Sequence, residues 1–121
     1  MYTIYGIKSC NTMKKAFTLL DELGVPYNFH DYKKSGIDAA TLETWIDQIG
    51  LDTLINRKGT TWRALSETDQ AAANTRAGAI QLMQNKTSVI KRPILVGDRA
   101  GKAVMICGLQ EDQYRQLAEA V

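Results

Sequence analysis

The sequence predicts an α/β domain built on a mixed four-stranded sheet that helices cover. The first observation is a β-α-β pattern at the start of the chain, and the second is a β-β-α pattern at its end, with several helices between them. The third is size, because 121 residues with 45% hydrophobic and 23% charged side chains suit one globular core and not two. We therefore expect a single domain over residues 1–121.

The opening unit is predicted as strand, helix and strand. Residues 2–6 form a short β-branched and aromatic run, which is typical of a strand. Apolar residues follow at helical spacing over 11–23, and Gly24 and then Pro26 stop that helix. Residues 27–32 alternate with period two and predict the second strand.

The middle of the chain predicts helices and loops. Asp38 can cap a helix that Gly50 ends. The short apolar stretch 51–55 is expected to pack against this helix rather than to form a strand, and 56–61 is expected to be a loop. Two further short helices are predicted over residues 66–74 and 75–85.

The closing unit is predicted as a β-hairpin and a helix. The apolar runs 94–96 and 103–106 flank a polar connection that contains glycine. A last helix begins at about Gln110 and places Tyr114, Leu117, Ala118 and Val121 on one face. The whole order of elements resembles the thioredoxin-like arrangement, with the third strand between the first and the fourth. A right-handed β-α crossover leaves Cys10 at the carboxyl end of the first strand, where open α/β sheets usually place their sites.

Cys10 is the main candidate functional residue, because it lies between the first strand and the first helix. A cysteine at the start of a helix meets unpaired backbone N–H groups and the positive end of the dipole, and both favour the nucleophilic thiolate. Lys8, Lys14 and Lys15 add positive charge nearby. The alternative is a buried cysteine that only packs. The order strand, loop, cysteine, helix favours a reactive thiol.

Composition and charge exclude several classes of protein. A net charge of +2 is too small to indicate direct binding of nucleic acid or of an anionic membrane, and no apolar run approaches the length of a membrane span. The first residues lack the basic and apolar regions of a signal peptide. Cys10 and Cys107 are too far apart in sequence to suggest a secreted disulfide framework. We therefore expect a monomer in the reducing cytoplasm.

Three motifs together resemble the ArsC/Spx family, most closely its YffB branch. They are Tyr5-Gly6-Ile7-Lys8-Ser9-Cys10-Asn11-Thr12, Asn56-Arg57-Lys58-Gly59-Thr60-Thr61-Trp62-Arg63 and Ile90-Lys91-Arg92-Pro93-Ile94. The resemblance implies a thioredoxin-like fold with a helical insertion at roughly residues 38–88. A proline that precedes the third strand of this fold is characteristically cis and faces the reactive cysteine. The alternative for Pro93 is an ordinary proline at a strand start.

The resemblance also implies a chemistry. Glutathione-coupled arsenate reductases of the family use one cysteine, matched here by Cys10, and three arginines that hold the oxyanion. Arg57 and Arg92 match two of these arginines, but no arginine occupies the third place, in the stretch from Ile106 to Leu109. The loss of one charge-assisted contact costs on the order of 1.5–3 kcal/mol, which speaks against arsenate as the natural substrate. We therefore expect a glutathione-dependent thiol–disulfide reductase, with glutathione as co-substrate and glutaredoxin as a further candidate partner.

The candidate binding residues for glutathione follow from the same motifs. They are Lys8, Asn11, Thr12, Arg57, Arg92 and Pro93. A guanidinium can grip a carboxylate with two hydrogen bonds, and glutathione carries two carboxylates. From the residues alone, exposed surface residues are the preferred explanation of the two arginines, and the resemblance favours the functional role instead. Arg63 is left open, because pairing with an acidic neighbour would also explain it.

Two other functions stay open at this point. One is a true arsenate reductase, and the other is an Spx-like regulator that binds RNA polymerase without catalysis. Spx-type regulators often carry a Cys-x-x-Cys switch, but Met13 stands at the second position here, so that disulfide cannot form. His30, the single histidine, is expected to be a half-exposed strand residue rather than a base for Cys10. One histidine and two distant cysteines give no recognisable metal site.

Cys107 is expected at the end of the fourth strand, at the same end of the sheet as Cys10. With one strand between them, the two backbones would be ~10 Å apart. A disulfide needs Cα atoms within about 7 Å, so direct pairing would require movement of a loop. Cys107 is therefore either a small packing residue or a residue that resolves a mixed disulfide on Cys10.

Overall fold

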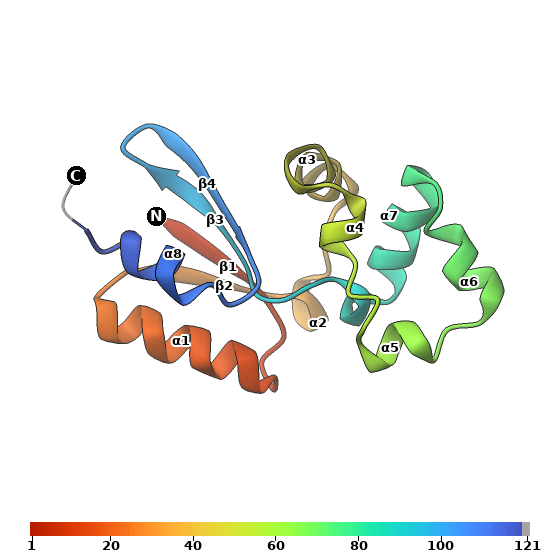
Figure 1. The fold of residues 1–121 in the computed structure, drawn as a ribbon, viewed down its shortest axis with the longest axis horizontal. Coiled ribbons are helices and arrows are strands. Elements are labelled where there is room, and N and C mark those ends of the chain that lie inside the picture. Colours follow the sequence, from red (N-terminus) through yellow and green to blue (C-terminus); the bar gives the residue numbers. More distant parts are fainter. Residues whose placement is uncertain (120–121) are drawn as a thin grey trace. The chain divides into compact units, whose positions relative to one another are not determined.

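A mixed sheet of four strands forms the first part of the fold, as the sequence predicts (Figure 1). The computed structural model describes residues 1–119. The strands are β1 (Tyr2–Gly6), β2 (Tyr27–Asp31), β3 (Ile94–Arg99) and β4 (Lys102–Cys107). Their order is β2-β1-β3-β4, with β1 parallel to β2 and antiparallel to β3, and with β3 antiparallel to β4. The third strand therefore lies between the first and the fourth, as expected.

The two helices α1 (Asn11–Leu23) and α8 (Glu111–Gln116) pack on one face of this sheet (Figure 1). Alternate strand residues point to that face and meet the apolar stripe of α1. The resulting core consists of Tyr2, Ile4, Met13, Ala16, Leu19, Leu20, Val25, Leu95, Ile106 and Tyr114. Gly24 ends α1 with φ +70°, a left-handed conformation that glycine adopts without strain. Of the predicted last helix, Val121 lies outside the described residues.

By its internal contacts the chain divides into two compact units. The sheet unit comprises Met1–Tyr32 and the residues from Arg92 onward, and the helical unit comprises Lys33–Lys91. The short helix α2 (Tyr32–Ser35) begins at the last residue of the first segment. The other helices before β3 are α3 (Ala39–Ile49), α4 (Leu51–Leu54), α5 (Thr60–Arg63), α6 (Glu67–Ala72), α7 (Arg76–Asn85) and the 3₁₀ turn η1 (Thr87–Val89).

Caps and ion pairs organise the helical unit. Asp38 accepts a hydrogen bond from the backbone N–H of Thr41 at 2.7 Å, which confirms the predicted cap of α3. Arg76, at the start of α7, pairs with Glu43 and Asp47 on α3 at 3.2 and 2.7 Å. These contacts join α3 and α7, whose apolar faces are buried against their neighbours.

Several element boundaries differ from the prediction for identifiable reasons. The second strand ends at Asp31 and not at residue 32, because β2 pairs only with β1, and Asp31 is opposite its last residue. Residues 51–54 form a helical turn and not a strand, as expected. Thr60 and Thr61 belong to α5 and not to the predicted loop. The carbonyl of Trp62 in this helix accepts from the Gln70 side chain at 3.0 Å, a tertiary contact that loop composition does not reveal.

The last two strands are longer than predicted, because their pairing continues through polar residues. Arg99 and Lys102 still face each other across the hairpin. Ala100 and Gly101 form the two-residue turn with φ +54° and +81°, the backbone signs of a type I′ turn. The sequence did not predict which two residues form this turn, because Asn or Gly is usual at the first turn position and Ala100 stands there.

Gly78 lies in α7, where its lack of a side chain is required by its neighbours. A Cβ at this position would overlap the backbone carbonyl oxygen of Ala72. The backbone N–H of Gly78 donates to Oγ1 of Thr75 at 3.1 Å, which caps the helix. Because α6 approaches the start of α7 so closely, only glycine fits at this position, although glycine has a low helix propensity.

We predict that Gly78→Ala destabilises the protein by about 1–3 kcal/mol, the usual cost of overpacking, although alanine is the better helix former. The overlapping atom belongs to the backbone, so no side-chain rotation relieves it. Urea unfolding followed by circular dichroism measures the change. Gln81→Ala, at an exposed position of the same helix, is the control and should change the unfolding free energy by less than about 0.5 kcal/mol. An equally stable or more stable Gly78→Ala variant would contradict this packing argument.

Candidate functional site

Cys10 occupies the N-cap position of α1, directly after the turn that follows β1. Its backbone is extended, with φ −106° and ψ 132°, and its carbonyl accepts from the N–H of Lys14 at 3.0 Å to close the first helical turn. The side chain is half-buried at the edge of the core. Met13 holds this turn in place, because its fully buried side chain fills the space that Gly6 leaves beside β1.

The surroundings of Cys10 lower the pKa of its thiol below the ordinary value of 9.0. Partial burial alone raises the pKa, since it disfavours the charged form. This effect is outweighed by hydrogen bonds from the backbone N–H of Met13, from the guanidinium of Arg92 and from the backbone N–H of Thr12, together with the positive charge of Arg92. The helix start and one arginine thus favour the thiolate, the nucleophilic form.

Arg92 reaches Cys10 because of its place in the sheet. It lies two residues before the start of β3, which lies beside β1, and β1 leads into the loop that carries Cys10. The Arg92–Pro93 peptide bond is cis, as the resemblance implies. Pro93 is buried, and its carbonyl accepts from the backbone N–H of Gly108 at 2.8 Å. That hydrogen bond ties the end of β4 to the start of β3.

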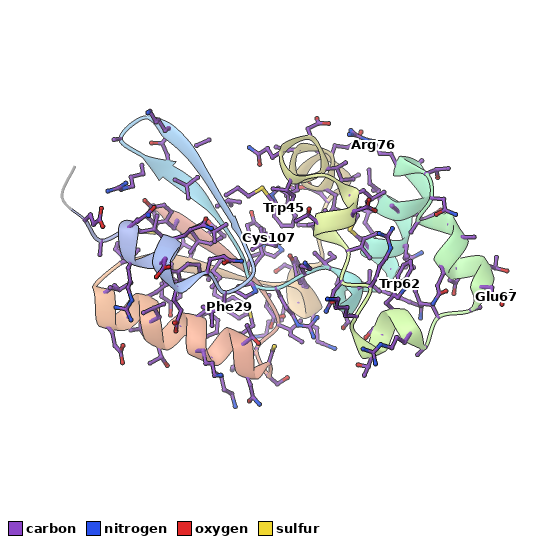
Figure 2. All side chains as sticks on the ribbon, in the orientation of Figure 1. Phe29, Trp45, Trp62, Glu67, Arg76 and Cys107 are labelled. Atoms are coloured by element: carbon purple, nitrogen blue, oxygen red, sulfur yellow. The ribbon has the colours of Figure 1, made fainter. Side chains whose placement is uncertain are left out.

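Cys107 lies at the end of β4 (Figure 2), on the same end of the sheet as Cys10, as the topology predicts. It is opposite Ile94 on β3, which is in turn opposite Tyr5 on β1. Two strand spacings place its backbone about 10 Å from that of Tyr5. Cys107 is half-buried, and neither cysteine forms a disulfide in the structure. Its role as a resolving or a packing residue stays a prediction.

Tyr32 is a member of this neighbourhood that the sequence did not single out. Its side chain is only 2% exposed, and its ring lies 6.3 Å from that of Tyr5 and 6.2 Å from that of His30. Burial raises the pKa of its hydroxyl, the charges of Tyr5 and Cys107 raise it further, and the charge of Arg92 lowers it. Tyr32 and His30 are two residues apart, and in an extended chain this spacing places their side chains on the same side of the sheet.

The remaining residues that the sequence analysis considered lie around Cys10 and in β2. Lys8 lies in the exposed turn before Cys10, and Asn11 is the exposed first residue of α1. Thr12 contributes its backbone N–H to the thiol. His30 is half-buried in β2 with its ring 4.7 Å from that of Tyr5, which fits the predicted strand position.

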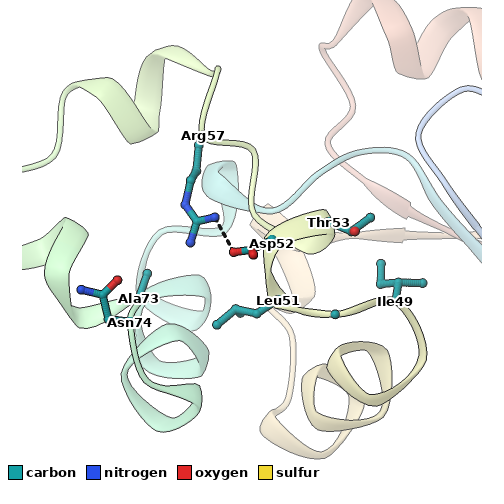
Figure 3. Close-up of a pocket in the computed structure, with 8 residues that line it drawn as sticks. Ile49, Leu51, Asp52, Thr53, Arg57, Ala73 and Asn74 are labelled. Carbon is teal, nitrogen blue, oxygen red and sulfur yellow. Dashed lines mark hydrogen bonds and ion pairs between the residues drawn. The ribbon is translucent and has the colours of Figure 1, made fainter.

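Arg57 belongs to the helical unit, and so do Asp52 and Trp62, which its guanidinium contacts. Its guanidinium pairs with the carboxylate of Asp52 at 2.6 Å (Figure 3). It also lies 5.3 Å from the ring centre of Trp62. It lines an open cavity of about 540 Å³ together with Asp52, Asn74 and the residues around Leu51. The structure therefore brings Cys10, Thr12 and Arg92 together, and it gives Arg57 an acidic partner that the sequence did not suggest.

Arg63 does not pair with an acidic neighbour within the part of the chain that the structure describes. Its guanidinium donates to the backbone carbonyl of Lys58 at 2.6 Å, which closes the loop before α5. Over residues 1–119, no three His, Cys, Asp or Glu side chains are close enough to hold a metal ion. Within the same residues, no helix has both the length and the apolar character needed to cross a membrane.

A mixed sheet in the order β2-β1-β3-β4, a cysteine at the helix start after β1 and a cis-proline before β3 define a thioredoxin-like protein. The chain belongs to the ArsC family, whose model matches residues 5–117.

Its similarity to known proteins extends over almost the whole chain. A YffB protein of known structure is 45% identical, with a TM-score of 0.86, and the match covers 98% of this chain and 100% of that one. An arsenate reductase (ArsC) related protein from Brucella melitensis is 44% identical, with a TM-score of 0.69 and coverage of 95% and 92%. An uncharacterised protein from Haemophilus influenzae is 38% identical over 95% of this chain and 96% of its own length.

We predict that Arg92→Gln raises the pKa of Cys10 and slows its alkylation by iodoacetamide severalfold near neutral pH, because the variant loses the charge that favours the thiolate. Arg92→Lys keeps the charge but not the planar hydrogen-bonding geometry. Its alkylation rate should therefore lie between those of wild type and Arg92→Gln. Alkylation rates across a pH series, assigned to Cys10 by peptide mass, measure the effect. Arg99→Gln, at the opposite end of β3, is the control. Equal pH profiles for Arg92→Gln and wild type would refute the coupling.

A second prediction concerns stability and pH. Because the pKa of Cys10 is lower in the folded than in the unfolded chain, its ionisation stabilises the fold fully above the ordinary thiol value of 9.0. This contribution is lost as the pH falls through the folded pKa. The unfolding free energy of wild type relative to Cys10→Ser should therefore rise with pH from the lowered folded pKa up to about pH 9, with Cys107 common to both proteins. Urea unfolding at several pH values tests this, and a difference that stays constant with pH would show no lowered pKa.

Proposed function

We propose that this protein is a glutathione-dependent thiol–disulfide reductase in which Cys10 is the single nucleophile. The observation that carries the proposal is the lowered pKa of Cys10, caused by the start of α1 and by Arg92. A thiol that is ionised at lower pH presents more nucleophile to a disulfide near neutral pH. The protein would be expected in the cytoplasm, where glutathione is the abundant small thiol.

The proposed reaction has two exchange steps. The Cys10 thiolate attacks the glutathione sulfur of a mixed disulfide, so that the Cys10–glutathione bond forms and the substrate leaves as a thiolate that takes up a proton. The thiolate of a second glutathione then attacks the glutathione sulfur bound to Cys10. Oxidised glutathione is released, and Cys10 returns as the thiolate. Glutaredoxin is the alternative reductant for the second step.

Arg92 has two roles in this proposal. Its charge favours the attacking thiolate, and a guanidinium suits the geometry of a carboxylate such as those of glutathione. Lys8, Asn11, Thr12 and Pro93 are proposed to contribute to the same binding surface. The role predicted for Arg57 stays a prediction, since its guanidinium is paired with Asp52 in the structure.

Arsenate reduction is the second candidate, favoured by the names of two relatives. One is the arsenate reductase related protein from Brucella melitensis, and the other is a possible arsenate reductase from Streptococcus mutans, 31% identical to this chain. The end of β4 argues against it. Gly108 turns the chain there with φ +81° next to Cys107, where the reductases of the family carry their third arginine. Arsenate would therefore bind on the order of tenfold to a hundredfold more weakly.

We predict that oxidised glutathione converts Cys10 into a mixed disulfide faster than it modifies an unperturbed thiol, because the thiolate fraction is larger. Intact-mass analysis should show one glutathionyl group on wild type and on Cys107→Ser, and none on Cys10→Ser under the same brief treatment. Turnover of a glutathionylated peptide with reduced glutathione should disappear in Cys10→Ser. Reaction at Cys10 no faster than that of free cysteine would overturn the proposal, and turnover with arsenate alone would favour the second candidate.

The same samples decide the role of Cys107. If Cys107 resolves the mixed disulfide, glutathione is released and wild type ends two hydrogens lighter than the reduced protein, whereas Cys107→Ser keeps its glutathionyl group. If Cys107 only packs, both proteins keep the glutathionyl group equally long.

A further inference from the structure

The helical unit contains an open cavity whose lining carries both signs of charge. Its volume of about 540 Å³ is within the range of pockets that bind small molecules. Arg57 supplies the positive charge and Asp52 the negative charge, and Asn74 adds an amide. Every residue that lines the cavity belongs to the helical unit, so the cavity lies within one compact part of the chain.

The ion pair in this cavity has free groups on both partners. Nη1 of Arg57 meets Oδ1 of Asp52 at 2.6 Å, and no other hydrogen bond or ion pair among residues 1–119 involves either side chain. The other N–H groups of the guanidinium and the second carboxylate oxygen are therefore open to a ligand. Both side chains are accessible, with exposed fractions of 38% and 91%. Ion pairs with this exposure add little stability, so the fold gains little from placing the two charges here.

The rest of the lining suits a small molecule with a short hydrocarbon chain. Asn74 is exposed, and its side-chain amide, which can both donate and accept, makes no hydrogen bond among the described residues. Leu51 and Ile49 are half-buried and Ala73 is buried, so they present apolar surface to the cavity. Figure 3 shows Ala73 and Asn74 across the cavity from Asp52.

The two adjacent charges define the class of ligand. A simple anion on Arg57 meets the repulsion of Asp52, and a simple cation on Asp52 meets the repulsion of Arg57. A ligand with a carboxylate and an ammonium group close together satisfies both charges at once, and an α-amino-acid group carries both on one carbon. We propose that this cavity binds an α-amino-acid group, with its carboxylate on Arg57 and its ammonium group on Asp52.

Two sources can supply such a group. One is the γ-glutamyl end of glutathione, whose α-amino and α-carboxylate groups are both free, and the other is a free amino acid. The methylene groups of a glutamyl chain suit the apolar surface of Leu51 and Ile49. The inference rests on the proposed function only in naming glutathione, and the ligands of the experiment distinguish the two sources.

The experiment is a titration of the isotope-labelled full chain followed by NMR. The signals are the side-chain amide of Asn74 and the backbone N–H of Gly50, since both residues line the cavity. Four ligands are compared at constant pH and ionic strength. They are S-methylglutathione, whose sulfur cannot form a disulfide, its N-acetyl derivative, which lacks the ammonium group, free glutamate and inorganic phosphate.

Asp52→Asn is the decisive variant, because its effect has opposite signs for the two kinds of ligand. It should weaken the binding of S-methylglutathione about threefold to tenfold, the effect of losing one exposed charge-assisted contact. The N-acetyl derivative and phosphate should bind equally or more tightly, because the repelling carboxylate is gone. Arg57→Gln should weaken the binding of every ligand. Glu67→Gln, exposed on α6 and outside the cavity lining, is the charge control and should stay within about twofold of wild type.

Several results would overturn the inference. One is equal or tighter binding of S-methylglutathione by Asp52→Asn, and another is equal binding of the N-acetyl derivative and its parent compound by wild type. A titration in which no ligand shifts the signals of Asn74 and Gly50 has the same meaning. Glutamate bound as tightly as S-methylglutathione identifies a free amino acid as a sufficient ligand, whereas tighter binding of S-methylglutathione identifies glutathione.

The proposed function is tested separately by the reaction of Cys10 with oxidised glutathione. If S-methylglutathione binds in a manner that depends on Asp52 but Cys10 does not react, the reductase is refuted and the cavity remains a binding site. If Cys10 reacts but no ligand shifts Asn74, the reductase remains and this inference is refuted.

Discussion

The hydrogen bond from Arg92 to Cys10 is the side-chain contact by which the sheet helps the helix start to lower the pKa of this thiol. Partial burial raises the pKa of the thiol. The backbone N–H groups of Met13 and Thr12 lower it, together with the guanidinium of Arg92. The contact joins two segments that are far apart in sequence, the loop after β1 and the approach to β3. The antiparallel pairing of β1 with β3 is what brings them together. The sheet topology is therefore a condition for the lowered pKa of Cys10.

Most of the sheet unit could be predicted from the sequence, because its signals are local. Alternation, helical spacing and the glycine and proline after residue 23 placed β1, α1 and β2 to within a residue. The cis bond before Pro93 came from the resemblance and not from the residues, since X–Pro bonds are only rarely cis. The site was predictable where it consists of a helix start. Tyr32 was not, because burial and the lack of a hydrogen-bond partner are properties of the folded chain.

The helices α3, α6 and α7 of the helical unit also lie where the sequence predicts them. What the sequence could not show is how neighbouring helices contact one another. Gly78 is intelligible only from the carbonyl of Ala72 that lies where its side chain would be. Arg57 is similar, since a motif identifies the arginine but not the carboxylate of Asp52 beside it. Charge pairs on exposed loops leave little trace in a single sequence.

Met13 has both a packing role and an electrostatic role, and together they make the ionisation of Cys10 depend on temperature. Its side chain anchors the first turn of α1 in the core beside Gly6, and its backbone N–H supports the thiolate of Cys10. Helix ends open locally at a lower free energy than the whole fold. Fraying of this single turn would withdraw the support while the sheet stays intact. The nucleophilicity of Cys10 therefore depends on the integrity of this one helical turn, and it should decrease at temperatures below the global melting transition.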